Sequence, residues 1–140
     1  MNKYGLTTDR TQDHVDRLNK LRAIGWNNMS ESQRREYTDY ASLGAYNYMN
    51  LNYVESVVWI LSAELGLTLT TKMNWTNWDV PIQSDMNRYL GNVKTLVSKY
   101  AETHDVTDFP PLPESMNHLT WEGANNIEIC LTKMMEGIGM

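Results

Sequence analysis

Apolar residues recur at helical spacing along most of the chain, most clearly between residues 50 and 66. A broad stripe on one face of a helix is formed there by Leu51, Val54, Val57, Val58, Leu61 and Leu65. Similar patterns cover further stretches, at 11–25, 29–44, 79–102 and 120–137. The patterns predict an all-α, single domain over residues 1–140, with about five helices. Three are long and amphipathic and are expected to form a bundle.

Residues typical of helix ends support these boundaries. Thr11 is suited to cap the first helix, and Gly25 to end it in a left-handed conformation. Ser30 and Gln33 have the spacing of a capping box at the start of the second helix. Asn50 is predicted to cap the third helix. Three further assignments complete the set: Gly66 as its end, Asp79 with Pro81 as the start of the fourth helix, and Thr120 as the start of the fifth.

The segments between the helices are of two kinds. Residues 67–77 alternate partly between apolar and polar side chains, which predicts a short extended arm too isolated to form a sheet. Residues 103–118 are rich in proline and predict a helix-free connector. Trp26 is expected to fill the corner between the first two helices. Gly91, inside the fourth helix, predicts a close approach of another helix, since glycine there costs about 1 kcal/mol relative to alanine.

Charge and composition narrow the classes of function. The net charge of −5 argues against a phosphate-binding surface, so no nucleic-acid partner is expected. Arg34 and Arg35 are the densest positive spot in the helices and are interpreted as solvated charges. No apolar run reaches the roughly 20 residues of a membrane span, and the first ten residues lack a signal core, so no membrane partner is expected.

No pattern typical of catalysis or metal binding is present in the sequence. His14, His104 and His118 lack the partner spacing of a metal site, and Cys130 stands alone on an apolar-rich helix. Phosphate-binding glycine loops and a serine nucleophile elbow are absent. We therefore expect no catalytic residues, no metal, no cofactor and no enzymatic activity.

Aromatic residues are the candidate contact residues. Tyrosines are concentrated between residues 37 and 53, and an exposed tyrosine-rich strip suits a protein partner or a polysaccharide better than catalysis. Trp75 ends the arm and is predicted to fold back onto the helices as an anchor. Trp78 precedes the fourth helix and is predicted to point outward. The binding residues proposed from sequence are Tyr46, Tyr48, Tyr53 and Trp78.

Four segments in order, 9–37, 44–65, 75–96 and 111–131, carry a resemblance to a known family. Its most distinctive parts are Asp9-Arg10-Thr11, Gly44-Ala45-Tyr46-Asn47, Trp75 with Asp79 and Pro81, and Met116-Asn117 with Leu119-Thr120. The chain resembles, over residues 8–138, a helical module of minor structural and tail-associated proteins of phages and prophages of Firmicutes. The resemblance implies no enzymatic activity. It also implies a place in the virion, near the tail or baseplate, for a protein made in the host cytoplasm.

The leading interpretation is therefore a helical adaptor or decoration module that binds other phage structural proteins or a second copy of itself. One alternative is a host-surface carbohydrate-binding module, in which the aromatic residues stack on a glycan. The other is an intracellular phage effector that binds and inhibits a host protein.

Overall fold

The computed structural model describes residues 4–140, except for the side chains of residues 40–42. This part of the chain is all-helical, as the sequence predicts, and contains no strand. Its elements are α1 (Gln12–Ile24), the short 3₁₀ helix η1 (Trp26–Asn28), α2 (Glu31–Gly44), α3 (Tyr48–Glu64), α4 (Gln83–Ala101) and α5 (Trp121–Gly137).

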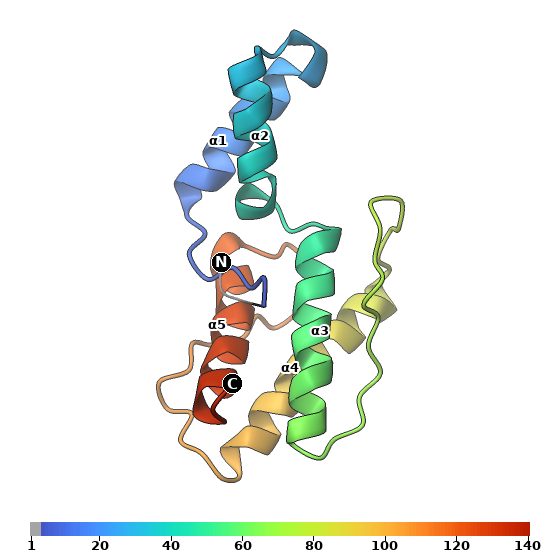
Figure 1. The fold of residues 1–140 in the computed structure, drawn as a ribbon, viewed down its shortest axis with the longest axis vertical. Helices are drawn as coiled ribbons and strands as arrows, with labels where there is room; N and C mark the ends of the chain where they lie inside the picture. Colours follow the sequence, from blue (N-terminus) through green and yellow to red (C-terminus); the bar gives the residue numbers. More distant parts are fainter. Residues whose placement is uncertain (1–3) are drawn as a thin grey trace.

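The helices form a body and a projection. Helices α3, α4 and α5 pack on one another as the body, and α1 and α2 form an antiparallel hairpin that extends from one end of it (Figure 1). The hairpin packs mainly against itself. It buries Leu18, Leu21 and Met29, which is a small core compared with that of the body.

Helices α3 and α5 run from the end that carries the hairpin to the opposite end, and α4 crosses them obliquely and finishes at that same end (Figure 1). Two long connections, residues 65–82 and 102–120, bring the chain back between them. Antiparallel helices need only short loops, so this topology explains the length of both connections. It also places the C-termini of α3, α4 and α5 together at one end of the molecule.

The core of the body is built from the apolar stripes that the sequence shows. Side chains with almost no exposed surface come from α3, α4 and α5 and from the segments before α1 and α4. They include Leu6, Val54, Leu61, Trp75, Tyr89, Val93, Leu96, Ile127, Leu131 and Met134. On the inner face of α5, the side chains of Ala124, Ile127, Leu131, Met134 and Met135 are all buried.

Several predicted helix ends are confirmed. The side chains of Thr11, Ser30 and Thr120 each accept a hydrogen bond from a backbone N–H of the first turn. Gly66 has a φ of 71°, and the N–H of Leu67 bonds the carbonyl of Ser62, which closes α3. Gly25 also has a positive φ, of 83°, but its ψ of 139° is outside the left-handed helical region that we expected.

Two predicted helix starts are wrong. Asn47, and not Asn50, caps α3, because its Oδ1 accepts from the N–H groups of Met49 and Asn50. Helix α4 begins at Gln83, four residues after Asp79. The carboxylate of Asp79 instead accepts from the N–H of Thr76 and closes a turn in the preceding loop.

Two packing predictions are also wrong. A Cβ at Gly91 would meet no atom within 4 Å, so no helix approaches α4 closely there. A glycine that does permit a close helix approach is Gly44, where a Cβ would lie 2.7 Å from the carbonyl oxygen of His14 on α1. Trp26 does not fill the corner of the hairpin and is 50% exposed.

Candidate functional site

The extended arm is held against α3 by the side chain of Asn52. Its Oδ1 accepts from the backbone N–H of Trp75 at 2.7 Å, and its Nδ2 donates to the carbonyl of the same residue at 2.8 Å. A single amide thus satisfies both backbone groups of Trp75, as a neighbouring β-strand would. The arm therefore needs no sheet to be ordered.

A buried carboxylate, that of Glu55, completes this attachment. Its side chain accepts from the indole Nε1 of Trp75 at 2.6 Å and from the backbone N–H of Lys72 at 3.0 Å. It also pairs with the guanidinium of Arg88 on α4, and this hydrogen bond raises the pKa of Arg88. Buried charges are tolerated when they are paired and hydrogen-bonded in this way. Glu55 therefore joins the arm, α3 and α4 at one point.

The same arrangement occurs a second time, where the N-terminal segment lies on α5. Asn125 exchanges two hydrogen bonds with the backbone of Arg10, at 3.1 and 2.9 Å. Three residues later, Glu128 accepts from the N–H of Thr7 at 3.0 Å and pairs with the guanidinium of Arg10. Burial raises the pKa of Glu128, and the charge of Arg10 opposes that shift. Both extended segments are therefore fixed by an Asn-x-x-Glu pair on a helix.

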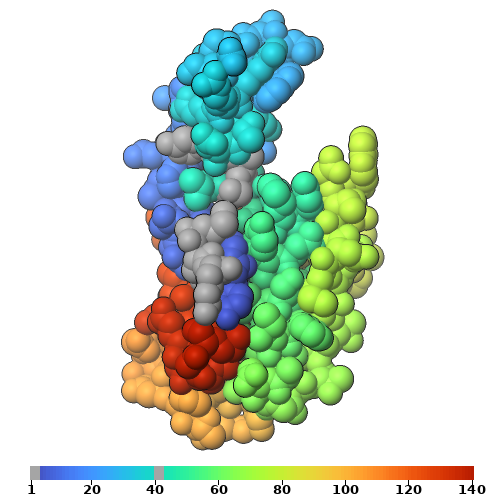
Figure 2. Space-filling view, viewed as in Figure 1, coloured from blue at the N-terminus to red at the C-terminus, as the bar shows by residue number. Residues whose placement is uncertain are grey.

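Beyond Trp75 the chain forms a projecting loop, residues 76–82, whose apolar side chains are exposed. Trp78 is 87% exposed, Val80 82% and Ile82 61%. The loop stands beside α3 and clear of the hairpin (Figures 1 and 2). Exposed apolar residues next to one another in a loop are typical of a contact surface. We call residues 76–82 the contact loop.

The contact loop is ordered by its own hydrogen bonds. The carboxylate of Asp79 accepts from the N–H of Thr76 at 2.8 Å and lies 3.7 Å from the ammonium of Lys72. The hydrogen bond from the Thr76 N–H lowers the pKa of Asp79, and the nearby charge of Lys72 lowers it further by a smaller amount. The hydroxyl of Thr76 in turn accepts from the N–H of Trp78 at 3.3 Å. With the buried Trp75 before it, the loop presents Trp78 from a fixed base.

The predicted placements of the two tryptophans, inward for Trp75 and outward for Trp78, are therefore confirmed. Trp75 is 4% exposed and belongs to the core, whereas Trp78 is the most exposed large apolar side chain among the described residues. The three tyrosines proposed beside Trp78 are placed differently, and the structure does not bring all four residues into one patch.

Tyr46 points inward rather than to a partner. Its hydroxyl is hydrogen-bonded to that of Tyr89, its ring lies 5.2 Å from the Arg10 guanidinium carbon, and burial raises its pKa. Tyr53 packs its ring over Gly5, where a Cβ would come within 2.5 Å of it, and is 39% exposed. Tyr48, at the start of α3, is 37% exposed, so both of these rings have surface available for contact.

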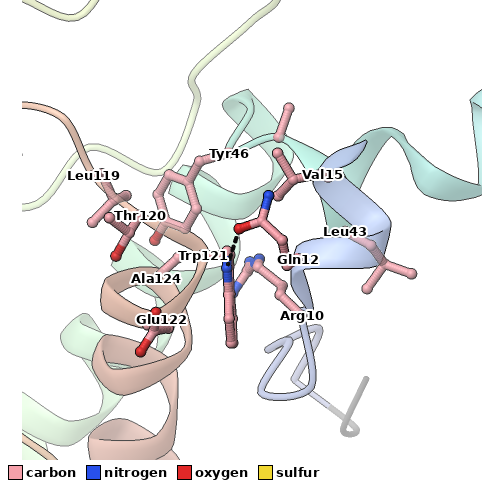
Figure 3. Close-up of a pocket in the computed structure, with 12 residues that line it drawn as sticks. Arg10, Gln12, Val15, Leu43, Tyr46, Leu119, Thr120, Trp121, Glu122 and Ala124 are labelled. Carbon is pink, nitrogen blue, oxygen red and sulfur yellow. Dashed lines mark hydrogen bonds between the residues drawn. The ribbon is translucent and has the colours of Figure 1, made fainter. Parts of the chain in front are cut away.

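A cavity of about 340 Å³ lies where the hairpin meets the body (Figure 3). Across it the indole Nε1 of Trp121 donates to the side-chain oxygen of Gln12 at 3.0 Å. The remaining wall combines the start of α5 with apolar side chains that include Val15, Leu43 and Leu119. The guanidinium of Arg10 at this wall is paired with Glu128 through Nη1, while its Nε and Nη2 are buried without a hydrogen-bond partner.

Sequence reasoning missed the residues that hold the contact loop in place. The local sequence pattern assigns no role to Asn52 or Glu55, because polar residues on an apolar helix are common on its solvated face. A signal was present, since Glu55 falls among Leu51, Val54 and Val58, which are the buried positions of α3. A carboxylate within an apolar stripe indicates a buried partner.

Two other kinds of site are absent from the described part of the chain. No group of three or more His, Cys, Asp and Glu side chains in residues 4–140 is arranged to hold a metal ion. None of the helices described is both long enough and apolar enough to cross a membrane.

The fold and the contact loop define a helical-bundle protein with an anchored, projecting apolar loop. Comparison with models of protein families found no match. Comparisons with curated proteins and with solved structures also found none.

Proposed function

We propose that this protein is a non-enzymatic protein-binding module that acts as an adaptor or decoration component of a phage particle, associated with its tail. The observation that carries the binding role is the contrast between Trp75, which is 4% exposed, and Trp78, which is 87% exposed, three residues apart. One tryptophan fixes the base of the loop and the other is free to enter a partner. Tryptophan is among the side chains that dominate binding energy at protein interfaces.

The energetics favour binding through a loop that is ordered beforehand. Ordering a flexible side chain or loop costs free energy on binding, about 0.5–1.5 kcal/mol for each side chain. Asn52, Glu55 and Asp79 already restrain the chain around Trp78 in the free protein. The exposed apolar area of Trp78, Val80 and Ile82 then contributes to affinity with little ordering cost.

The phage assignment rests on four sequence segments that resemble, in the same order along the chain, a module of tail-associated proteins. A protein partner fits the contact loop better than a glycan, because a sugar site concentrates aromatic and polar groups in a cleft. Here Trp78 and Val80 project from the surface, and Tyr46 and Tyr53 pack against other parts of the chain.

The test is incorporation of the chain into particles made from the genome that encodes it. We expect wild-type protein in purified particles and at least about tenfold less of the Trp78→Ala variant, the usual loss for an interface hot spot. Trp59→Ala is the matched control, since Trp59 on α3 is also exposed, at 55%, but lies outside the contact loop.

The proposal is overturned if folded Trp78→Ala protein enters particles as well as wild type does. It is also overturned if the protein is absent from particles. Binding to cell-wall polysaccharide that requires Trp78 would establish the glycan alternative. Stoichiometric capture of a host protein through Trp78 would establish the effector alternative.

A further inference from the structure

Charge is distributed unevenly along the chain. Residues 17–36, which form the distal part of the hairpin and are called here the hairpin tip, carry five cationic side chains and two carboxylates, a net charge of +3. The rest of the chain carries seven cationic and fifteen anionic side chains, a net charge of −8. The overall charge of −5 therefore hides a basic tip on an acidic molecule.

The hairpin tip also presents an aromatic side chain. Trp26 is 50% exposed, the guanidinium carbon of Arg34 lies 5.1 Å from its ring centre, and Tyr37 meets it edge-on. Beside it is a hollow of about 350 Å³. The side chains that line the hollow are Trp26, Glu31, Arg34, Arg35, Thr38 and Asp39.

Some of the cations at the tip are neutralised within the chain and some are not. Arg17 pairs with Glu36, and Arg35 pairs with Glu31. Lys20 and Arg22 are exposed, and among the described residues neither has an ion-pair partner. The unpaired cations and the half-exposed Trp26 all belong to the hairpin tip, and side chains of these kinds suit an acidic protein partner.

The opposite end of the molecule is acidic. The C-termini of α3, α4 and α5 lie together there (Figure 1), and each helix C-terminus carries about half a negative charge. Exposed carboxylates add to this field, namely Glu64, Glu102, Asp105, Asp108 and Glu136. Lys99 pairs with Glu102 and Lys133 with Asp108, which leaves three carboxylates without a salt bridge among the described residues.

We propose that copies of this chain associate head to tail, with the hairpin tip of one copy on the acidic end of the next. The two surfaces lie at opposite ends of the longest axis (Figures 1 and 2). A contact between two different surfaces of one chain is heterologous, so it builds a ring or a filament. The proposal extends the protein-binding role by naming a partner, and it uses surfaces separate from the contact loop.

A second copy suits the tip better than a nucleic acid does. The remainder of each molecule, at −8, repels a polyanion that extends beyond the tip. An acidic end on a second copy is compact and meets the tip without bringing the two acidic bodies side by side.

A charge exchange tests the proposal. The tip variant is Lys20→Glu with Arg22→Glu, and the end variant is Glu64→Lys with Glu136→Lys. All four residues are exposed. Sedimentation velocity at low salt should show self-association of the wild type, weakened about tenfold or more in either variant, because each then has like charges at both ends. An equimolar mixture of the two variants should associate again.

Two controls accompany the exchange. Lys94→Glu alters an exposed cation in the middle of α4 and should leave association unchanged. Trp78→Ala should also leave it unchanged, so failure of the proposed function and failure of this inference are distinguishable. Circular dichroism of each variant checks the fold.

Three results would overturn the proposal. One is a wild type that stays monomeric at low salt and high concentration. Another is a mixture of variants that associates no better than either variant alone. The third is wild-type binding to double-stranded DNA that the tip variant loses, with self-association unaffected.

Discussion

The indole of Trp75 donates a 2.6 Å hydrogen bond to the carboxylate of Glu55, which is 1% exposed and lies 20 residues earlier in the chain. This contact joins the core to the base of the contact loop. It ties the contact loop to the stability of the whole body, because Glu55 also pairs with Arg88 of α4.

Replacing Trp75 by alanine should therefore strongly destabilise the folded protein. We expect Trp75→Ala to lower the free energy of unfolding by about 3–5 kcal/mol, the usual range for a buried large aromatic residue. Trp78→Ala should change it by less than about 0.5 kcal/mol, since that side chain is 87% exposed. Urea denaturation of both variants measures the difference. Equal midpoints would show that the anchor lies elsewhere.

The side-chain amide of the half-buried Asn52 should contribute strongly to the stability of the fold. Asn52→Ala leaves the N–H and carbonyl of Trp75 without their partners, and each unsatisfied buried group costs about 1–3 kcal/mol. Asn74→Ala, one residue before Trp75 and exposed, serves as the control and should be near neutral. Thermal unfolding compares the two, and a control as destabilised as Asn52→Ala would refute the role of the amide.

Substitution by alanine should change the stability of the protein in opposite directions at two glycines. Gly91→Ala should stabilise the protein by about 0.5–1 kcal/mol, because Gly91 is in the interior of α4 and a Cβ there meets nothing within 4 Å. Gly44→Ala should destabilise it, since the Cβ would lie 2.7 Å from both the His14 carbonyl and the Leu18 Cβ. Melting temperatures that move in the same direction would contradict the packing of α2 on α1.

Cys130 should be nearly inert in the folded protein. Burial raises the pKa of its thiol to about 11, and the side chain is 1% exposed. At pH 8 about one thiol in a thousand is then ionised, and the thiolate is the reactive form. Reaction with a disulfide reagent should be slow, should accelerate about tenfold per pH unit between pH 8 and 10, and should become fast in urea. Fast reaction at pH 8 without urea would place Cys130 at the surface.

The sequence predicted the helices well because their signals are local. Apolar periodicity and side-chain caps, such as those of Thr11 and Ser30, depend on residues within a few positions of one another. The roles of Trp75 and Trp78 followed from their places at the end of the arm and just before a helix.

The parts that were not predicted depend on residues far apart in the chain. Asp79 was expected to start α4, but Thr76 and Lys72 engage its carboxylate in the preceding loop. The Asn-x-x-Glu pairs of α3 and α5 lack any sequence repeat around them, so only the structure shows that they hold extended segments in the same way. Tyr46 was expected at a surface, and no local pattern indicates Tyr89, 43 residues later, as its partner.

The N-terminal segment, finally, has consequences for the order of synthesis and folding. Thr7 donates to Glu128 across 121 residues, so this contact cannot form until α5 has left the ribosome. The α1–α2 hairpin is able to form early, because its contacts are local. Until α5 is present, Arg10 in the segment before the hairpin has no Glu128 to pair with. Thr7 and Arg10 are thus made well before the α5 residues that secure them, and the closing step brings their segment onto α5.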